Sequence, residues 1–338
     1  MRLDVTLDVT PQRVTVGKPS MARLEIANRS SRRVTGLGVE LPVGVSAAHF
    51  TTPLLAPGAS YEEWVTIPTS HRGVVTIGPV QTQRGDPFGL VRRQLAWAGP
   101  TELFVHPGVA AIDELGTGLL RDLEGQATQD VSTSDLEFHA LREYEPGDDA
   151  RHIHWPSSAR ATAMAGEQRF LVRQFLDTRR SHVVVIADVQ DDVYASGDEF
   201  ELALSCAASV AVRAIGDGMD LTIVAGGQKQ TRPAPHAALD TFSRAERSGA
   251  PGAALGEVAK RLAGTTADAS LCVLVTGRAC PFGRLELVRL MVPMVVGMVV
   301  IRACVGNGIA LRATSGFTEL SVGALDDLPR ALRGRAAV

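Results

Sequence analysis

The sequence has few cysteines, and none in a pattern typical of a metal or disulfide site. Among its 338 residues are four cysteines, with no C-x-x-C pair and no histidine at zinc-finger spacing from them. Cys206, Cys272 and Cys304 lie in apolar runs, where a free thiol behaves as a small buried hydrophobe. The fourth is Cys280. This usage favours free thiols in a reduced, cytosolic compartment over a disulfide framework.

Several motifs of enzymes and nucleotide-binding proteins are also missing. The chain has no G-x-x-x-x-G-K-[ST], no G-x-G-x-x-G after a strand and no G-x-S-x-G. These absences argue against a P-loop, a dinucleotide fold and a hydrolase nucleophile elbow. The formal net charge of -3 gives no electrostatic footprint for nucleic acid or an anionic membrane. We therefore expect a protein that is not an enzyme and does not bind nucleic acid.

Long hydrophobic runs are absent as well. The N-terminus has no apolar stretch of signal-peptide type. The longest uncharged apolar run, between Arg289 and Arg302, is too short to span a bilayer and contains Pro293 and Gly297. We expect a soluble cytoplasmic chain that associates with membranes only through a segment it lacks, or in a longer or partnered form.

Two patterns of hydrophobicity divide the chain. Residues 1–107 show short, partly alternating segments separated by Pro, Gly, Asn and Ser, which predicts an immunoglobulin-type β-sandwich, although a barrel fits almost as well. Residues 108–134 are rich in Gly, Thr, Ser and Asp and are predicted to be a linker with one helical turn near Leu119. Residues 135–180 form a charged segment.

Residues 181–338 alternate between β-branched strands and helices, which predicts a doubly wound α/β sheet within an α+β multidomain protein. A helix over 198–218 is expected to be capped by Ser196 or Asp198 and stopped by Gly216 or Gly218. The remaining helices are predicted over 237–245, 254–263, 284–291 and 325–334. Strands are predicted over 168–176, 181–188, 219–226, 270–277, 295–303 and 318–323.

One candidate site follows the first buried strand of this sheet. Asp188, Asp191 and Asp192 lie at its carboxyl end, where such sheets bind ligands. Oxygen-rich clusters of this kind hold Mg²⁺ or Ca²⁺. The alternative is that the three carboxylates solvate a loop and cap the next helix.

The segment "EFHALREYEPGDDARHIHWPSSAR", residues 137–160, offers a second candidate. His152 and His154 are two residues apart and would share one face of a strand, with His139, Asp148 and Asp149 nearby in the sequence. Such a group could form a zinc or iron site and serve a metal-dependent hydrolase or nuclease. The alternative is a pair of half-exposed histidines on an edge strand.

The same segment can also be a structural brace or docking surface, and this interpretation is favoured. Pro146 and Gly147 suit the central positions of a type II turn. Planar guanidinium groups can form two parallel hydrogen bonds to a carboxylate. Networks of such pairs fix the position of the segment more than they stabilise the fold. If the network is partly buried, Arg151→Ala should destabilise the fold. The acidic and basic side chains of this segment nearly balance in charge; they are Arg142, Glu143, Asp148, Asp149, Arg151 and Arg160.

These residues also carry a family resemblance. The segment resembles the signature of the domain-of-unknown-function 58 family, at Glu137, Phe138, Leu141, Arg142, Tyr144, Pro146, Gly147, Asp148, Arg151, Ile153, Trp155, Ser158, Ala159 and Arg160. Upstream, "HRGVVTIGPVQTQRGDPFGLVRR" is similar to the second signature of the family, at Arg72, Gly73, Gly78, Pro79, Asp86, Pro87, Phe88, Gly89 and Leu90.

The resemblance implies an N-terminal β-domain followed by a von Willebrand factor A-like domain. Members of the family are commonly found beside MoxR-type AAA ATPases, which implies an adaptor or chaperone-linked role with such an ATPase as partner and no established enzymatic activity. Members also commonly carry a membrane hairpin ahead of the β-domain. The docking residues implied are Arg142, Glu143, Tyr144, Pro146, Gly147, Asp148, Asp149, Arg151, Trp155, Ser158 and Arg160.

The sequence departs from the metal-ion-dependent adhesion site of A-domains. That site uses Asp-x-Ser-x-Ser, whereas this chain has Asp188, Gln190 and Asp192. Farther on, Thr276 and Gly277 stand where an acidic residue is expected. An extra carboxylate helps to fill the open coordination position. We expect no cofactor and no working adhesion site, with Mg²⁺ at a degenerate site of Asp188 and Asp192 as the alternative.

Overall fold

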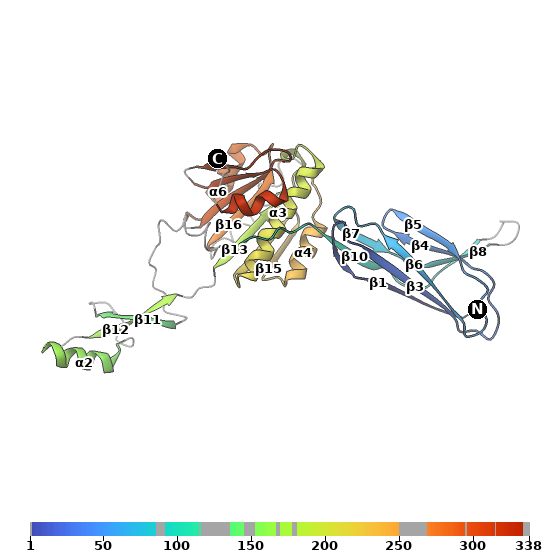
Figure 1. Cartoon of the computed structure of the whole chain (residues 1–338), viewed down its shortest axis with the longest axis horizontal. Helices are drawn as coiled ribbons and strands as arrows, with labels where there is room; N and C mark the ends of the chain where they lie inside the picture. The colour runs from blue at the N-terminus through green and yellow to red at the C-terminus, as the bar shows by residue number, and fades with distance from the viewer. Residues whose placement is uncertain are drawn as a thin grey trace. The chain divides into compact units, whose positions relative to one another are not determined.

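The computed structural model describes residues 2–85, 92–113, 115, 136–144, 153–166, 170–177, 181–249, 269–294, 296–314 and 316–333. The chain divides into two compact units. The first combines Met1–Leu119 with His182–Val338, and the second is Leu120–Ser181 (Figure 1). The first unit contains two sheets from the N-terminal part of the chain and one from the C-terminal part.

The N-terminal part is made of short strands in two sheets. One sheet has the order β1 (Leu3–Thr10), β3 (Ser20–Asn28) and β6 (Ser60–Ile67), with antiparallel neighbours. The other has the order β2 (Arg13–Thr15), β10 (Thr101–His106), β7 (Gly73–Ile77), β4 (Gly38–Val43), β8 (Gln81–Gly85) and β9 (Arg92–Ala96), with β5 (Ser46–Thr51) paired to β4. In this second sheet β2 and β10 run parallel.

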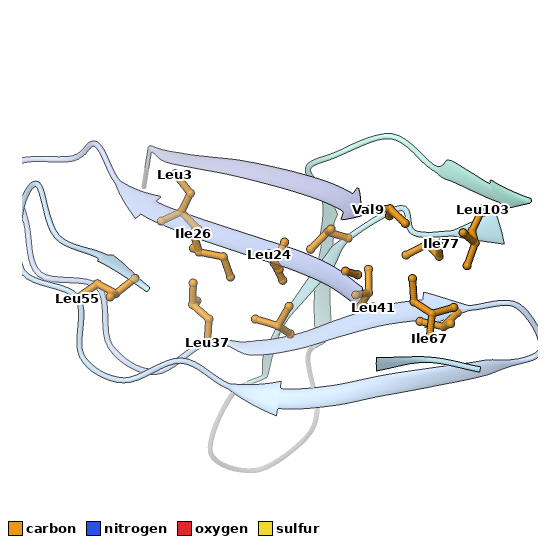
Figure 2. Close-up of a cluster of buried hydrophobic side chains, with 14 of the residues drawn as sticks. Leu3, Val9, Leu24, Ile26, Leu37, Leu41, Leu55, Ile67, Ile77 and Leu103 are labelled. Carbon is orange, nitrogen blue, oxygen red and sulfur yellow. The ribbon is translucent and has the colours of Figure 1, made fainter. Parts of the chain in front are cut away.

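Side chains from both sheets pack into one apolar core (Figure 2). Leu24 and Ile26 on β3 belong to the same buried cluster as Leu41 on β4 and Leu103 on β10. Successive side chains of a strand point to opposite faces, so the alternating segments of the sequence place one apolar face of each sheet against the other. The expected β-domain is therefore a two-layered β-structure.

The C-terminal part is built on a seven-stranded mixed sheet. Its order is β15 (Gln228–Thr231), β14 (Asp220–Ala225), β13 (His182–Ala187), β16 (Leu271–Gly277), β17 (Gly297–Ala303), β19 (Thr318–Val322) and β18 (Ala310–Ala313). The five central strands are parallel, and β15 and β18 pair antiparallel at the two ends. The chain crosses from β14 and β15 back to β16, so the strand order reverses between β13 and β16.

Helices and short 3₁₀ turns lie between these strands and after the last of them. In the described residues they are η3 (Asp191–Val193), α3 (Gly197–Gly216), α4 (Pro235–Arg244), α6 (Phe282–Met291), η4 (Leu325–Asp327) and α7 (Leu328–Leu332). The Ser196 hydroxyl accepts a hydrogen bond from the Glu199 N–H, so the predicted N-cap of the long helix α3 is confirmed. The helix packs on β13, β14, β16 and β17. The helix predicted over 254–263 lies outside the described residues.

The second unit is small. It consists of β11 (Leu136–Glu143), which pairs antiparallel with β12 (Leu171–Asp177), and helix α2 (Trp155–Ala165). Most of the predicted linker, including Leu119, lies outside the described residues. Within the described part of the chain, no helix has the length and apolar character needed to cross a membrane.

Candidate functional site

The reversal of strand order places a polar site at the carboxyl ends of β13 and β16. Asp188 follows β13 directly, and Thr276 is buried near the end of β16. The Thr276 hydroxyl donates a hydrogen bond to Asp188 Oδ2 at 3.0 Å, and the Gln190 N–H donates to Asp188 Oδ1 at 3.1 Å. In open α/β sheets this crevice is the usual position of a ligand site. The geometry therefore makes Asp188 the central carboxylate of the candidate site.

The environment of Asp188 disfavours its charged form. Burial raises the pKa of its carboxyl above the usual value, although the hydrogen bonds from Gln190 and Thr276 and the positive charge of Arg284 act in the opposite direction. The nearby charge of Asp192 raises the pKa further. Both oxygens of Asp188 already accept a hydrogen bond, so the carboxylate is held in place by the protein itself.

A guanidinium group neutralises the second predicted acid. Arg284 on α6 donates to both oxygens of Asp192, at 3.2 and 2.8 Å. The hydrogen bond from Arg284 is the main reason that the pKa of Asp192 is lowered. Asp191, the third acid of this loop, pairs with Arg247 at 2.8 Å. Two of the three predicted carboxylates are thus engaged by arginines that follow them by many residues in the sequence.

The wall of the site is closely packed. A Cβ atom added to Gly277 would lie 2.2 Å from the carbonyl oxygen of Val193, so this backbone approach requires glycine. The hydroxyl of Tyr194 donates to the Asp188 carbonyl oxygen, and burial raises the pKa of this phenol well above its usual value. Cys280 is buried beside these residues, and its burial raises the pKa of its thiol. Neither side chain is available as a reactive anion at neutral pH.

Further ion pairs surround the site. The carboxylate of Glu199 is buried, accepts from the Ala195 N–H at 2.8 Å and pairs with Arg278. Arg302 is buried as well, pairs with Glu319 at 2.7 Å and donates to the Cys280 carbonyl oxygen at 2.8 Å. These charged side chains around the carboxyl ends of the strands therefore each have a partner of opposite charge within the chain. Among the described residues, no cluster of three or more His, Cys, Asp or Glu side chains could hold a metal ion.

The charged signature segment lies in the second unit and is described only in part. The rings of Tyr144 and Trp155 both pack edge-on against Phe170. Ser158 is buried, and its hydroxyl accepts from the Leu171 N–H at 2.8 Å and donates to the His154 carbonyl oxygen at 3.0 Å. This serine links helix α2 to strand β12. Arg160 is exposed on the same helix.

Much of the predicted brace lies outside the described residues, namely Pro146, Gly147, Asp148, Asp149 and Arg151, and so does His152 of the alternative metal site. The backbones of His139 and Arg142 belong to β11, but their side chains are not described, and Glu143 at the end of that strand is exposed. His154 lies at the start of helix α2, and its Nδ1 is 2.8 Å from the Ser157 hydroxyl. The strand on which the two histidines would share a face is therefore not present at His154.

The second signature contains an anchor that the sequence analysis did not assign. Arg72 has a side chain that is 6% exposed, and it pairs with Glu201 on α3 at 2.9 Å. Its guanidinium also donates to the carbonyl oxygens of Phe242 and Ser243 and lies 5.5 Å from the ring centroid of Phe200. The part of this signature from Asp86 to Leu90 lies outside the described residues.

A second charged contact joins the same parts of the first unit. Arg13 donates to both oxygens of Asp240 on α4, and His106 Nε2 lies 2.8 Å from Asp240 Oδ1. Burial raises the pKa of Asp240, but the hydrogen bonds from Arg13 and His106 outweigh it and leave this pKa below its usual value. No local sequence signal marks these residues, because each partner is more than a hundred positions away.

Comparison with known families identifies one stretch that includes both candidate regions. Residues 140–248 match the family described as "Protein of unknown function DUF58". This segment is similar to DUF58. The match runs from strand β11 through α2, β13, α3 and α4, so it contains Asp188, Asp192 and most of the charged segment. The resemblance found in the sequence is thus confirmed over the DUF58 segment.

Other comparisons add no argument about function. None of the curated proteins matches the chain. A CARDB domain from Pyrococcus furiosus is 15% identical over 31% of this chain and 92% of that chain, with a TM-score of 0.24. A cycloisomaltooligosaccharide glucanotransferase from Paenibacillus is 12% identical over 93% of this chain and 58% of that chain, with a TM-score of 0.23. These scores are too low to relate this chain to either fold.

Proposed function

We propose that this chain is a non-enzymatic adaptor that binds other proteins. It combines an immunoglobulin-like β-sandwich with a von Willebrand factor A-like domain. The strand order β15, β14, β13, β16, β17 and β19, with an antiparallel strand beside β14, supports the A-like assignment. The acid that follows β13 supports it as well, because Asp188 stands at the first position of an adhesion-site motif. The two sheets packed around one core support the sandwich.

The observation that carries the proposal is the ion pair between Asp192 and Arg284. An adhesion site or a metallohydrolase needs carboxylates that face a cation and leave a coordination position open. Here the guanidinium of Arg284 supplies the positive charge for Asp192 and also acts on Asp188. We therefore propose that the A-like domain binds its partner without a metal cofactor. A Mg²⁺ ion at this degenerate site would have to displace Arg284.

The proposed partner is a MoxR-type AAA ATPase, and the proposed process is complex assembly or chaperone-like work. The DUF58 match over residues 140–248 supports this partner, because the family resemblance implies an association with MoxR-type ATPases. The protein is proposed to work in the cytoplasm, with membrane association only in a longer or partnered form. The charged segment, from Arg142 to Arg160, is proposed as a docking element for that partner.

Direct binding tests the proposed function. The purified chain is titrated with the purified MoxR-type ATPase of the same host by biolayer interferometry, with and without ATP. Saturable binding is the expected result, and in the arm without ATP it should persist in EDTA, because the A-like domain is proposed to need no metal. Absence of binding up to about 100 μM would contradict the partner, since specific transient complexes form well below that concentration.

Metal analysis tests the rival function. A hydrolase or nuclease that uses His152 and His154 should carry stoichiometric Zn, Mn or Fe, and that metal should be lost when both histidines are replaced by alanine. This result would overturn the adaptor proposal.

Calorimetric titration with Mg²⁺ tests the degenerate site at Asp188 and Asp192. We expect no binding heat. A binding heat that Asp188→Ala abolishes would show that the site holds the ion.

A further inference from the structure

The outer face of the three-stranded sheet carries an unusual set of side chains. Its strand register places Asp8, Arg23 and Trp64 in one row across β1, β3 and β6. The next row contains Glu25 directly opposite Glu62. The alternate residues of the same strands point to the other side, where they form the apolar core. We call this outer surface, defined by Asp4, Asp8, Arg23, Glu25, Glu62 and Trp64, the Trp64 face.

Large apolar groups on this face are left uncovered. Trp64 is 51% exposed and Met21 is 38% exposed. Met21 pairs across the strands with Thr66, two residues from Trp64, so the two side chains are diagonal neighbours on one face. The guanidinium of Arg23 lies 6.0 Å from the centroid of the Trp64 ring. Trp, Met and Arg are residue types enriched where proteins bind each other, and Trp and Arg are also over-represented among the few residues that dominate the binding energy.

The charges of the Trp64 face indicate what it binds. Arg23 pairs with Glu62 and lies 3.6 Å from Glu25, and Arg29 lies 3.5 Å from Asp4. With Asp8, four carboxylates stand against two guanidinium groups, which leaves an excess of two negative charges. Such a surface repels phosphate backbones and anionic lipid headgroups and attracts lysine and arginine.

Protection of sheet edges accounts for only part of this arrangement. Charged side chains on the outer strands of a sheet prevent pairing with other chains, and Asp4 and Asp8 on β1 can serve this purpose. A tryptophan on β6 works against such protection, because it adds apolar surface to the other outer strand. The combination of an exposed Trp64 with surrounding acids fits a binding surface better than a protected edge.

We propose that the Trp64 face binds a lysine- or arginine-rich segment of a partner protein. One cation of the segment packs on the exposed part of the Trp64 ring, and neighbouring basic side chains pair with Asp8, Glu25 and Glu62. The apolar stems of these side chains cover Met21. This inference rests on one part of the proposed function, namely that the chain acts by binding another protein. It adds the surface that such a partner would contact.

A synthetic peptide tests the chemistry of the face without the partner. An extended peptide of about 12 residues that alternates lysine and threonine presents its cations with the two-residue period of a strand. Its affinity for the full chain is measured by biolayer interferometry, with tryptophan fluorescence as the second readout. The matched peptide has glutamate in place of lysine.

We expect the lysine peptide to bind and the glutamate peptide not to bind. Trp64→Ala should weaken binding of the lysine peptide by about two- to fivefold, which is the usual contribution of an exposed cation–aromatic contact. Asp8→Lys should weaken it as well, and so should a rise in NaCl from about 50 to about 500 mM. Glu286→Lys, an identical type of charge change at an exposed site on α6, is the matched control and should leave affinity unchanged.

Three results would overturn the inference. They are equal binding by Trp64→Ala, equal loss in Glu286→Lys and Asp8→Lys, or a Trp64-dependent fluorescence change with a neutral oligosaccharide such as maltoheptaose but not with the lysine peptide. Melting temperatures of the variants show whether each one is folded. Because the peptide assay contains no ATPase, failure here removes only the Trp64 face, whereas failure of the ATPase titration removes only the proposed partner.

Discussion

Arg72 and Glu201 form a two-bond ion pair although 129 positions separate them in the sequence, with distances of 2.9 and 3.0 Å. Arg72 precedes strand β7, and Glu201 lies in the second turn of helix α3. The same guanidinium donates to the Phe242 and Ser243 carbonyl oxygens at the end of α4. One buried arginine therefore connects the N-terminal sheets to two helices of the C-terminal sheet, and the role of the second signature is at least partly structural.

Arg72→Ala should lower the free energy of unfolding by about 2–4 kcal/mol, because it leaves two carbonyl oxygens and a carboxylate without their donor. Chemical denaturation of the full chain measures the change. The matched control is Arg29→Ala, since Arg29 pairs with Asp4 and both side chains are 59% exposed. An exposed pair of this kind should contribute less than about 1 kcal/mol. Equal effects of the two changes would contradict the proposed anchor.

Gly277→Ala should destabilise the fold by about 2–3 kcal/mol, because the new methyl group would overlap the Val193 carbonyl oxygen and the Tyr194 ring. Gly283→Ala is the control: a Cβ at this helical position has no atom within 4 Å, and alanine is the better helix former. Thermal denaturation should show a lower melting temperature for the first variant and an equal or higher one for the second. A normal melting temperature for Gly277→Ala would show that the close approach can relax.

Asp188→Asn should change how stability depends on pH. Burial raises the pKa of Asp188 in the folded state, so the folded chain binds more protons than the unfolded chain between the two pKa values. The free energy of unfolding of the wild type therefore falls as the pH rises through this window. Asparagine removes this contribution, so the variant should gain stability relative to the wild type as the pH rises above the usual pKa of an aspartate carboxyl. Parallel stability curves would contradict this result, and the exposed Asp326→Asn serves as control.

Ser158→Ala should destabilise the second unit by about 1–2 kcal/mol, because the half-buried Leu171 N–H loses the buried Ser158 hydroxyl as its acceptor. Ser157→Ala is a control on the same helix turn, since its hydroxyl contacts the His154 ring rather than the backbone of β12. Hydrogen exchange of the Leu171 amide measures the local effect. Faster exchange is expected in Ser158→Ala only, and equal protection in all three chains would argue against the link.

The elements that could be predicted from the sequence are those whose own residues determine them. The β-branched runs that became β13, β16 and β17 are buried on both faces, and Ser196 caps the helix that its position predicts. Strands β15 (QKQT) and β18 (ALRA) were missed by the sequence analysis. Each lies at one end of the sheet, has a single neighbouring strand and buries no side chain. Such edge strands form because a neighbouring strand pairs with them, and the local hydrophobic pattern of their own residues does not indicate this pairing.

The candidate site followed the same rule. The sequence indicated Asp188 and Asp192 because they follow a buried strand of an α/β sheet. It could not indicate Arg284, which lies 92 positions after Asp192 and meets it only because α6 follows β16, the neighbour of β13. The position of these acids at the end of a buried strand was predictable from local sequence. Its neutralisation by arginine depends on the fold.

The burial of all four cysteines has a practical consequence for studies of this protein. Burial raises the pKa of Cys206 and of Cys272 to about 12, and it also raises the pKa of Cys280 and Cys304. Thiol-directed dyes attack the thiolate, so the native cysteines should stay unlabelled at neutral pH while the chain is folded. A cysteine introduced at Met21 would accept a fluorophore beside Trp64 without any change to the native thiols.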